Sequence, residues 1–493
     1  MPSIYMLYRY PPLWKDIDAF WQLAAKADAV NILQYPPLYC FLSRIPFAIA
    51  SGLEGHSLHH NLLAKQTPTT LGLYLLILLQ HIALIGLMIY AILAVAGPSR
   101  VGASCCAIVL ASMGGLYAQA QTCGSESWST IAIVAVFAAG FRLIQHPERA
   151  AWVVYGIGLF FAIGSRHLNI LLIGWLPGML VLLWIISLWH NPGERRYWQT
   201  FVIACCIGVV TLGVNSAIQH ILMRSIKEKY RPTIGRTLSD RVSSFLKALP
   251  SEQRIALAQQ LASKQSDPLV RRAIQIQATT GLGPKGTGEE ITILLRENGL
   301  SNADALEKSD RLILAESLLY LRTFHPVLLN VIKSDIYTGM WTNQQKVALS
   351  PFYSHRWAAE DMVRRPDLWK YLTGYSRLNV DDAHAIYSAA EVDPYLGLWK
   401  HIPFWVLYIA VSFLGLLCWL FRRLSIWELI TTASILIVGL GMWAVNMICV
   451  YYMDRYALTL LIPVVTAFTL MIGTALQRSP GNGSRSEALV ELT

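Results

Sequence analysis

Residues 70–97, TLGLYLLILLQHIALIGLMIYAILAVAG, decide the fold class of this chain. The stretch contains no Lys, Arg, Asp or Glu over its whole length. A helix needs about 20 predominantly apolar residues to cross the hydrocarbon core of a bilayer. The sequence therefore predicts a membrane-spanning helix here.

Further apolar stretches extend this interpretation along the chain. They lie near residues 101–120, 128–145, 150–165, 168–189, 199–221, 402–421, 425–447 and 456–476. Only 14% of the 493 residues are charged, whereas soluble domains carry roughly 25%, so the chain lacks the polar side chains to cover a water-facing surface. The sequence predicts an all-α polytopic membrane protein with about nine transmembrane helices.

Arginines in the short connections give the predicted spans a direction, because Lys and Arg concentrate on the cytoplasmic side of a membrane. They lie at alternate junctions, at Arg100, Arg142, Arg149, Arg195, Arg196, Arg422, Arg423, Arg478 and Arg485. The opposite, outer side then holds residues 1–69, turns at 123–128, 165–167 and 451–455, and a large insert. The net charge of +10 is scattered rather than gathered into a stripe, which argues against a nucleic-acid partner.

The same pattern divides the chain into segments. They are an outer-side loop at 1–69, a first transmembrane bundle at 70–221, a soluble insert at 222–400, a second bundle at 401–477 and a cytoplasmic tail at 478–493. Residues 37–53 are apolar but contain Arg44 and Pro46. They form either a poor span or an interfacial, amphipathic segment.

Helical periodicity predicts that the insert has a helical core of its own. One helix face consists of Leu238, Val242, Phe245, Leu246 and Leu249, and Pro250 ends that helix. Asp267 and Pro268 have the residue types of an N-cap and a first helical position. Residues 310–332 are interpreted as one longer helix. None of the eight cysteines falls between Arg224 and Lys400, so the insert has no disulfide framework and no cysteine-based zinc site.

Two neighbouring carboxylates, Asp16 and Asp18, are the strongest candidates for chemistry. In a loop or a first helical turn both can point at one site. A carboxylate near a membrane interface can act as a general base toward a hydroxyl, or help to hold a divalent cation. The structural alternative is that one of them caps a helix.

Further polar residues interrupt the chain at the outer ends of predicted spans. They are Glu126, the pair Arg166 and His167, and Arg455. Ionisable residues at membrane depth tend to be functional because they are costly, but at span ends snorkelling lowers that cost. Each is therefore either an interfacial anchor or a site residue. Their position on the side that also holds Asp16 and Asp18 favours a common site.

Several short motifs occur in the order of a known family. Asp16-Ile17-Asp18 precedes Phe20 and Ala24, and Pro36-Pro37-Leu38-Tyr39 follows. Glu126, Ser165-Arg166 and the run from Arg455 to Pro463 come later. In this ordered set the chain resembles the GT-C superfamily of polytopic glycosyltransferases, which use polyprenyl-phosphate-linked sugars, and within it the protein O-mannosyltransferase and aminoarabinose-transferase type.

The chain also departs from the family pattern. Relatives begin with a span before the acidic loop, and this chain shows none in that place. Some relatives have a lysine before the Pro-Pro pair, where this chain has Tyr35. Lipid-phosphate contacts would then come from other residues. The insert at 222–400 does not resemble a recognised domain.

The resemblance implies a mechanism and a set of partners. Asp16 would be the general base of an inverting transfer, and Asp18 would assist it or bind a metal. Arg166, His167, Arg455, Glu126 and Tyr39 would bind the substrate. No cofactor is certain, and a divalent cation is a candidate. The donor would be a polyprenyl-phosphate-linked sugar, and a lipid, glycan or protein would accept it at the outer face of the bilayer.

Two other function classes stay open. A transporter or flippase would show repeated halves, broken spans and ionisable residues near the membrane midplane. A membrane-anchored interaction protein would tolerate substitution of Asp16, Arg166 and Arg455. The insert contains no Asn-X-Ser/Thr sequon, which favours a bacterial inner membrane over the membrane of the endoplasmic reticulum.

Overall fold

The structure, a computed structural model, describes most of the chain. The described ranges are residues 2–15, 36–54, 69–97, 99–190, 196–225, 234–280, 284–364, 379–450 and 453–477. Within them the secondary structure is helical apart from one pair of two-residue strands and an isolated bridge. The predicted all-α class is confirmed.

The chain divides into two compact units. The first comprises Met1–Tyr230, Thr342–Met442 and Ala457–Thr493, and the second comprises Arg231–Trp341 and Trp443–Tyr456. The first contains α1 (Pro2–Arg9), β1 (Leu13–Trp14), α3 (Pro37–Leu53), α4 (Thr70–Ala96), α5 (Arg100–Ala111), α6 (Gly114–Ala120), β2 (Thr122–Cys123), α7 (Ser125–Gln145), α8 (Arg149–Ser165), the 3₁₀ helix η1 (His167–Gly174), α9 (Trp175–His190), α10 (Arg196–Ser225), α17 (Gln344–Arg364), α19 (Val380–Glu391), α20 (Phe404–Leu420), most of α21 (Ile426–Cys449) and α22 (Leu458–Gln477).

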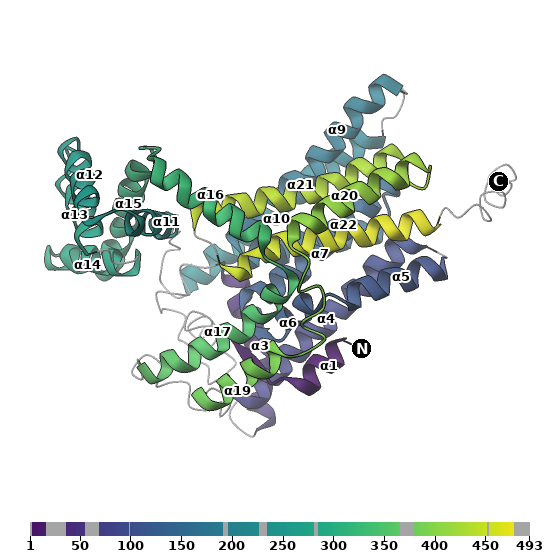
Figure 1. The fold of residues 1–493 in the computed structure, drawn as a ribbon, viewed down its shortest axis with the longest axis horizontal. Helices are drawn as coiled ribbons and strands as arrows, with labels where there is room; N and C mark the ends of the chain where they lie inside the picture. The colour runs from purple at the N-terminus through teal and green to yellow at the C-terminus, as the bar shows by residue number, and fades with distance from the viewer. Residues whose placement is uncertain are drawn as a thin grey trace, which may run out of the picture. The chain divides into compact units, whose positions relative to one another are not determined.

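Six described helices are long and apolar enough to cross a membrane. They are Thr70–Ala96, Ser125–Gln145, His167–Ser187, Tyr197–Ile221, Ile426–Cys449 and Asp454–Gln477. They coincide with six of the predicted spans, so the chain is a multi-pass membrane protein. Within the first unit, Figure 1 shows α4, α5, α7 and α22 packed side by side.

The predicted count of nine spans is not confirmed. The stretch 101–120 is divided between α5 and α6, which are bent by 62°. The stretches 150–165 and 402–421 form α8 and α20, each of 17 residues. At about 1.5 Å per residue such a helix is about 25 Å long, which is shorter than the ~30 Å hydrocarbon core. Residues 37–53 form a helix of the same length, α3.

The last carbonyls of α6, where that helix ends before β2, are bound by side chains from neighbouring helices. Gln80 of α4 donates from Nε2 to the carbonyl oxygens of Ala120 (2.8 Å) and Thr122 (3.1 Å). Ser127 of α7 donates to those of Gln119 and Thr122, both at 2.7 Å. Irregular backbone at membrane depth is tolerated only where it is buried in protein or lines a cavity. These contacts fix the segment that leads into β2.

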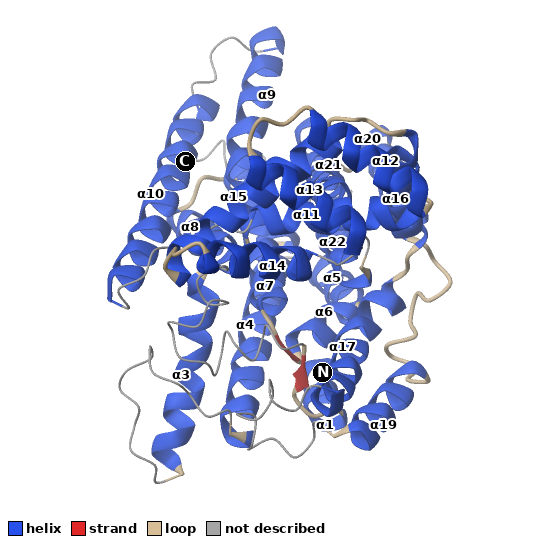
Figure 2. Ribbon diagram, turned by 90° about the vertical axis from the view of Figure 1, so that its left-hand side faces the viewer, coloured by secondary structure: helices blue, strands red, loops and turns tan. Residues whose placement is uncertain are grey.

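The two short strands join distant parts of the sequence. β1 pairs in parallel with β2, so that Leu13 lies opposite Thr122 and Trp14 opposite Cys123. The pair is drawn in red in Figure 2, and α17 packs against β1. Because parallel strands end at the same edge, the residues after Trp14 and those after Cys123 leave the pair side by side.

The second unit contains the helices of the insert. They are α11 (Ile234–Ala248), α12 (Ser251–Ser263), α13 (Pro268–Thr280), α14 (Pro284–Glu297), α15 (Asn302–Leu321) and α16 (Pro326–Trp341), followed by the end of α21 and the 3₁₀ helix η2 (Asp454–Ala457). Val242, Phe245, Leu246 and Leu249 are buried in its core, as the periodicity predicts. The carboxylate of Asp267 accepts a hydrogen bond from the amide of Leu269 at 2.8 Å, which confirms the predicted cap.

The prediction of one helix over residues 310–332 is wrong. α15 ends at Leu321 and α16 begins at Pro326, and the two are bent by 97°. Phe324 between them has φ 45°, a conformation that interrupts a right-handed helix. Pro326 has no amide hydrogen and starts the next helix at its first position.

The observed division also differs from the predicted segments. Residues 342–400 group with the membrane bundle rather than with the insert. The reason is α17, which packs against α6 and β1.

Candidate functional site

Glu126 is the centre of a charged cluster in the first unit. It lies in the first turn of α7, directly after β2, and only 3% of its side chain is exposed. Its Oε1 atom lies 2.8 Å from Nζ of Lys15 and 3.7 Å from a terminal guanidinium nitrogen of Arg166. A carboxylate this far from water requires such cationic partners.

The parallel strands explain why Lys15 reaches Glu126. Lys15 follows β1, and Glu126 comes three residues after the end of β2. The register therefore brings two segments more than 100 positions apart to one edge. Asp16 is the next residue after Lys15 in the sequence.

The C-terminal end of α8 fixes the position of Arg166. It is the C-cap of that helix, with an extended φ of −148°. Asn169 donates from Nδ2 to the carbonyl oxygen of Ala162 and to the hydroxyl of Ser129, both at 2.8 Å. The first bond satisfies a carbonyl at the end of α8, and the second joins the turn to α7. Arg166 is thereby directed toward Glu126.

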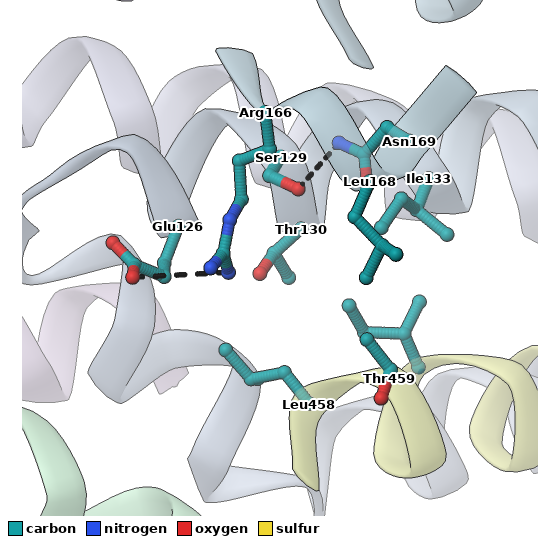
Figure 3. Close-up of a pocket in the computed structure, with 10 residues that line it drawn as sticks. Glu126, Ser129, Thr130, Ile133, Arg166, Leu168, Asn169, Leu458 and Thr459 are labelled. Atoms are coloured by element: carbon teal, nitrogen blue, oxygen red, sulfur yellow. Dashed lines mark hydrogen bonds and ion pairs between the residues drawn. The ribbon is translucent and has the colours of Figure 1, made fainter. Parts of the chain in front are cut away.

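A small pocket, partly open to its surroundings, lies beside this cluster. Its walls come from α7, from Arg166 and η1, and from α22 (Figure 3). The lining residues are Glu126, Ser129, Thr130, Ile133, Arg166, Leu168, Asn169, Leu458, Thr459 and Ile462. One end is charged, the middle carries hydroxyl groups and an amide, and the remainder is apolar.

The charges around the pocket favour an anion. Lys15 and Arg166 are cationic and Glu126 is anionic, so the cluster carries one net positive charge. Of the three, Arg166 and Glu126 line the pocket and Lys15 does not. Arginine presents a planar fork of donors that suits phosphate and carboxylate groups. The arrangement can therefore hold a negatively charged group beside the start of the acidic segment.

A second set of contacts fixes the N-terminal segment from the opposite side. Gln121 donates from Nε2 to the carbonyl oxygens of Tyr10 (2.8 Å) and Pro11 (3.1 Å). Its Oε1 lies 2.8 Å from Nε2 of His81, whose Nδ1 lies 3.0 Å from the hydroxyl of Ser3. Because the amide nitrogen of Gln121 faces two carbonyls, its oxygen is the acceptor, and His81 carries its proton on Nε2. This network holds the residues that lead into β1.

The predicted site residues are only partly brought together. Glu126 and Arg166 meet, as their common side of the membrane predicted. His167 is exposed at the start of η1 and does not line the pocket. Tyr39 is buried in a core cluster with Trp14, Phe47 and Cys123. Its role in binding substrate stays a prediction, as does that of His167.

The remaining predicted residues are Asp16, Asp18 and Arg455. Asp16 and Asp18 fall outside the described residues. Arg455 belongs to the second unit, where its guanidinium carbon lies 5.4 Å from the ring centre of Tyr456. The catalytic and binding roles of these residues stay predictions.

A metal site is likewise a prediction. Over the described ranges, no group of three or more His, Cys, Asp or Glu side chains could hold an ion. Asp16 and Asp18 lie outside these ranges.

Several residues of the site carried no signal in the sequence. Lys15, Thr130 and Asn169 belong to no recognised motif. His355 of α17 is fully buried and accepts a hydrogen bond at Nδ1 from the amide of Trp14 at 2.9 Å. It follows the insert, more than 300 positions after β1, so only the fold shows that it holds this strand.

The structure shows a multi-pass, all-α membrane protein with a small pocket that is lined at one end by Glu126 and Arg166. No protein-family model matches the chain, and no curated protein matches it. The resemblance to the GT-C superfamily therefore rests on the residues of this chain alone.

Proposed function

We propose that the protein is a membrane-embedded glycosyltransferase that moves a sugar from a polyprenyl-phosphate carrier to an acceptor hydroxyl. The observation that carries the proposal is the contact of Glu126 with both Lys15 and Arg166. These contacts bring Lys15, which precedes the acidic segment, together with Glu126 and Arg166, two residues on which the family resemblance rests. In this proposal Asp16, the next residue in the sequence, supplies the base, and Arg166 and Lys15 receive the phosphate leaving group.

The transfer would be a single in-line displacement. The carboxylate of Asp16 takes the proton of the acceptor hydroxyl as its oxygen attacks the anomeric carbon. The bond between that carbon and the phosphate oxygen breaks on the opposite face, so the anomeric configuration inverts. The electron pair leaves with the polyprenyl phosphate, whose developing charge Arg166 and Lys15 stabilise. Glu126 orients both cations.

The test is the consumption of lipid-linked sugar by the purified full chain. A panel of polyprenyl-phosphate-linked hexoses and pentoses is offered with lipid, glycan and peptide acceptors, and free polyprenyl phosphate is measured. We expect one donor to be consumed by the natural chain, and Asp16→Asn to lower the rate by about 10³-fold or more, because general-base catalysis contributes 10²–10⁴-fold.

A matched substitution separates chemistry from folding. Asp381 is exposed in the first turn of α19, so Asp381→Asn should keep the rate of the natural chain. Unchanged turnover by Asp16→Asn would show that Asp16 is not the base. Consumption of no donor by the natural chain would contradict the proposed function.

One observation favours a transporter as a second candidate. The 62° bend between α5 and α6 is a broken span of the kind that transporters use. At this bend the carbonyl oxygen of Ala111 accepts a hydrogen bond from the hydroxyl of Tyr395 at 3.0 Å, so it is bound within the protein. A transporter would move labelled substrate across a sealed vesicle without breaking a glycosidic bond, and this distinguishes the two.

The location of the site is part of the proposal. We place the pocket and the N-terminal segment on the outer side of the membrane, because arginines mark the alternate junctions as cytoplasmic. The absence of a sequon from the insert supports a bacterial inner membrane.

A further inference from the structure

Thr130 stands out among the buried threonines of the membrane bundle. A threonine inside a helix usually donates its hydroxyl hydrogen to the carbonyl four residues earlier. Thr466, Thr469 and Thr474 of α22 do so, at 2.7, 2.8 and 2.9 Å. Thr130 is only 2% exposed, yet among the described residues its hydroxyl has no hydrogen-bond partner.

The pocket explains this exception. Thr130 lines it one helical turn below Glu126, and in Figure 3 its oxygen lies on the side nearer the guanidinium group of Arg166. A buried hydroxyl without a partner costs free energy. A ligand oxygen in the pocket would supply the missing partner.

The order of the lining residues gives the ligand a direction. Glu126, Thr130 and Ile133 are spaced i, i+4 and i+7 and therefore share one face of α7. Measured along the helix axis, Thr130 lies about 6 Å and Ile133 about 10 Å beyond Glu126. Ile133 is joined on the other walls by Leu168, Leu458 and Ile462. Along α7 the lining thus passes from a charge, through a hydroxyl without a partner, to hydrocarbon, and Leu458 and Thr459 of α22 form the opposite wall (Figure 3).

We infer that Thr130 is a specificity-determining residue of a subsite for a phosphate ester of a hydrocarbon chain. The phosphate group lies at Arg166, and Thr130 donates its hydroxyl hydrogen to a phosphate oxygen. The first carbon atoms of the chain pack against Ile133, Leu168 and Ile462. This inference rests on the proposed function only for the identity of the hydrocarbon as a polyprenyl chain.

The alternative occupant with the same head-group chemistry is a free phosphate. Arg166 and Thr130 alone would bind it as well as the lipid, whereas the apolar walls would add affinity only for the ester. Burial of apolar surface stabilises by about 25 cal/mol per Å². A preference for the lipid phosphate over inorganic phosphate therefore reports on the apolar walls, and the effect of Thr130 reports on the hydroxyl.

The experiment measures binding to the purified full chain in a neutral detergent. The probes are farnesyl phosphate, inorganic phosphate and farnesol, and the variants are Thr130→Val, Thr130→Ser and Thr474→Val. Valine matches the shape of threonine without the hydroxyl. Thr474→Val is the control, because Thr474 is equally buried and bonded within its own helix.

We expect farnesyl phosphate to bind the natural chain at least tenfold more tightly than either other probe. Thr130→Val should weaken that binding about tenfold, since a hydrogen bond to a charged group contributes ~1.5–3 kcal/mol. Thr130→Ser should stay within about twofold of the natural chain, and Thr474→Val should not change the affinity. If Thr130→Val does not fold, as judged by thermal unfolding, Thr130→Ala replaces it.

Three results would overturn the inference. They are an unchanged affinity of the variant that lacks the hydroxyl, equal binding of inorganic phosphate and farnesyl phosphate, and equal binding of farnesol and farnesyl phosphate. The outcome is separable from that of the proposed function. Thr130-dependent binding without consumption of any donor would contradict the glycosyltransferase alone, and donor turnover with Thr130-independent binding would contradict the subsite alone.

Discussion

The ammonium group of Lys15 lies 2.8 Å from Oε1 of the buried Glu126. This contact joins the end of β1 to the first turn of α7 and thereby fixes where the acidic segment begins. Breaking a buried ion pair by removing one partner leaves an uncompensated charge. The pair therefore links β1 to α7 and stabilises the charged cluster beside the pocket.

The first prediction concerns Glu126 itself. Glu126→Gln removes the charge that holds Lys15 and Arg166, so the two cations should repel one another and lose their orientation. We expect the rate of donor consumption to fall about 100-fold, the loss typical of one misplaced electrostatic group.

The control for this prediction is Glu307→Gln, because Glu307 is an exposed partner of Arg311 within α15. It should leave the rate unchanged. A Glu126→Gln protein that turns over at the natural rate would show that the cluster does not serve catalysis.

The second prediction compares two tyrosines that share one acceptor. The hydroxyls of Tyr5 and Tyr10 donate to Oδ2 of Asp393 at 2.6 and 2.5 Å, and this anchors the N-terminal segment. Burial, followed by the bond to Asp393, raises the pKa of Tyr5 to about 12 and that of Tyr10 further, so both stay donors. Tyr10 is buried, whereas Tyr5 is 37% exposed.

Tyr10→Phe should accordingly lower the free energy of unfolding by about 1.5–3 kcal/mol, the contribution of a hydrogen bond to a charged group. Tyr5→Phe should cost less, because water can replace the lost bond. Thermal unfolding of the detergent-solubilised chain measures both, and a larger loss for Tyr5→Phe would contradict the assignment.

The third prediction is a dependence of stability on pH within the insert. Glu316 of α15 is fully buried, and over the described residues neither of its oxygens has a hydrogen-bond partner. Burial raises the pKa of Glu316 well above its usual 4.5. The folded state therefore keeps a proton that the unfolded state loses, and stability falls as the pH rises from about 4.5 toward the raised pKa.

The substitution Glu316→Gln removes this titration. The difference in melting temperature between the variant and the natural chain should be small at pH 4.5 and should grow in favour of the variant up to pH 8. Equal differences at every pH would contradict a buried, protonated Glu316.

The fourth prediction tests orientation with introduced thiols. Cys40 and Cys123 are buried, so the natural cysteines there are unsuitable reporters. Tyr8 is 92% exposed in α1, and Phe421 is 74% exposed beside Arg422. In a chain without other cysteines, a membrane-impermeant maleimide should label Tyr8→Cys in intact cells. It should label Phe421→Cys only after permeabilisation. The reverse pattern would place the pocket on the cytoplasmic side.

The fold was predictable where one property runs without interruption along the chain. The apolar stretches that become α4, α7, α10 and α22 needed only length and hydropathy. The bend between α5 and α6 was not predicted, because 101–120 is long and largely apolar. Tyr395, whose hydroxyl binds the carbonyl of Ala111 at the bend, lies 284 positions later in the sequence. Two-residue strands are too short to show a period.

The site residues also divide into those that the sequence predicts and those that it does not. Glu126 and Arg166 were predictable because charge at span ends is conspicuous and the connections gave both the same side. Lys15, Thr130 and His355 were not, since an isolated lysine, threonine or histidine is ordinary in any segment. Their importance comes from neighbours contributed by other helices, and these exist only in the folded chain.

The bond between His355 and the amide of Trp14 has a consequence for biogenesis. It joins residues 341 positions apart. At a synthesis rate of about 5–20 residues per second, roughly 20–70 s separate the emergence of the two partners from the ribosome. During that interval β1 has left the ribosome, but His355, which accepts the hydrogen bond from the amide of Trp14, has not yet been synthesised. The membrane-insertion machinery must therefore deliver the whole insert before the contact that holds β1 can form.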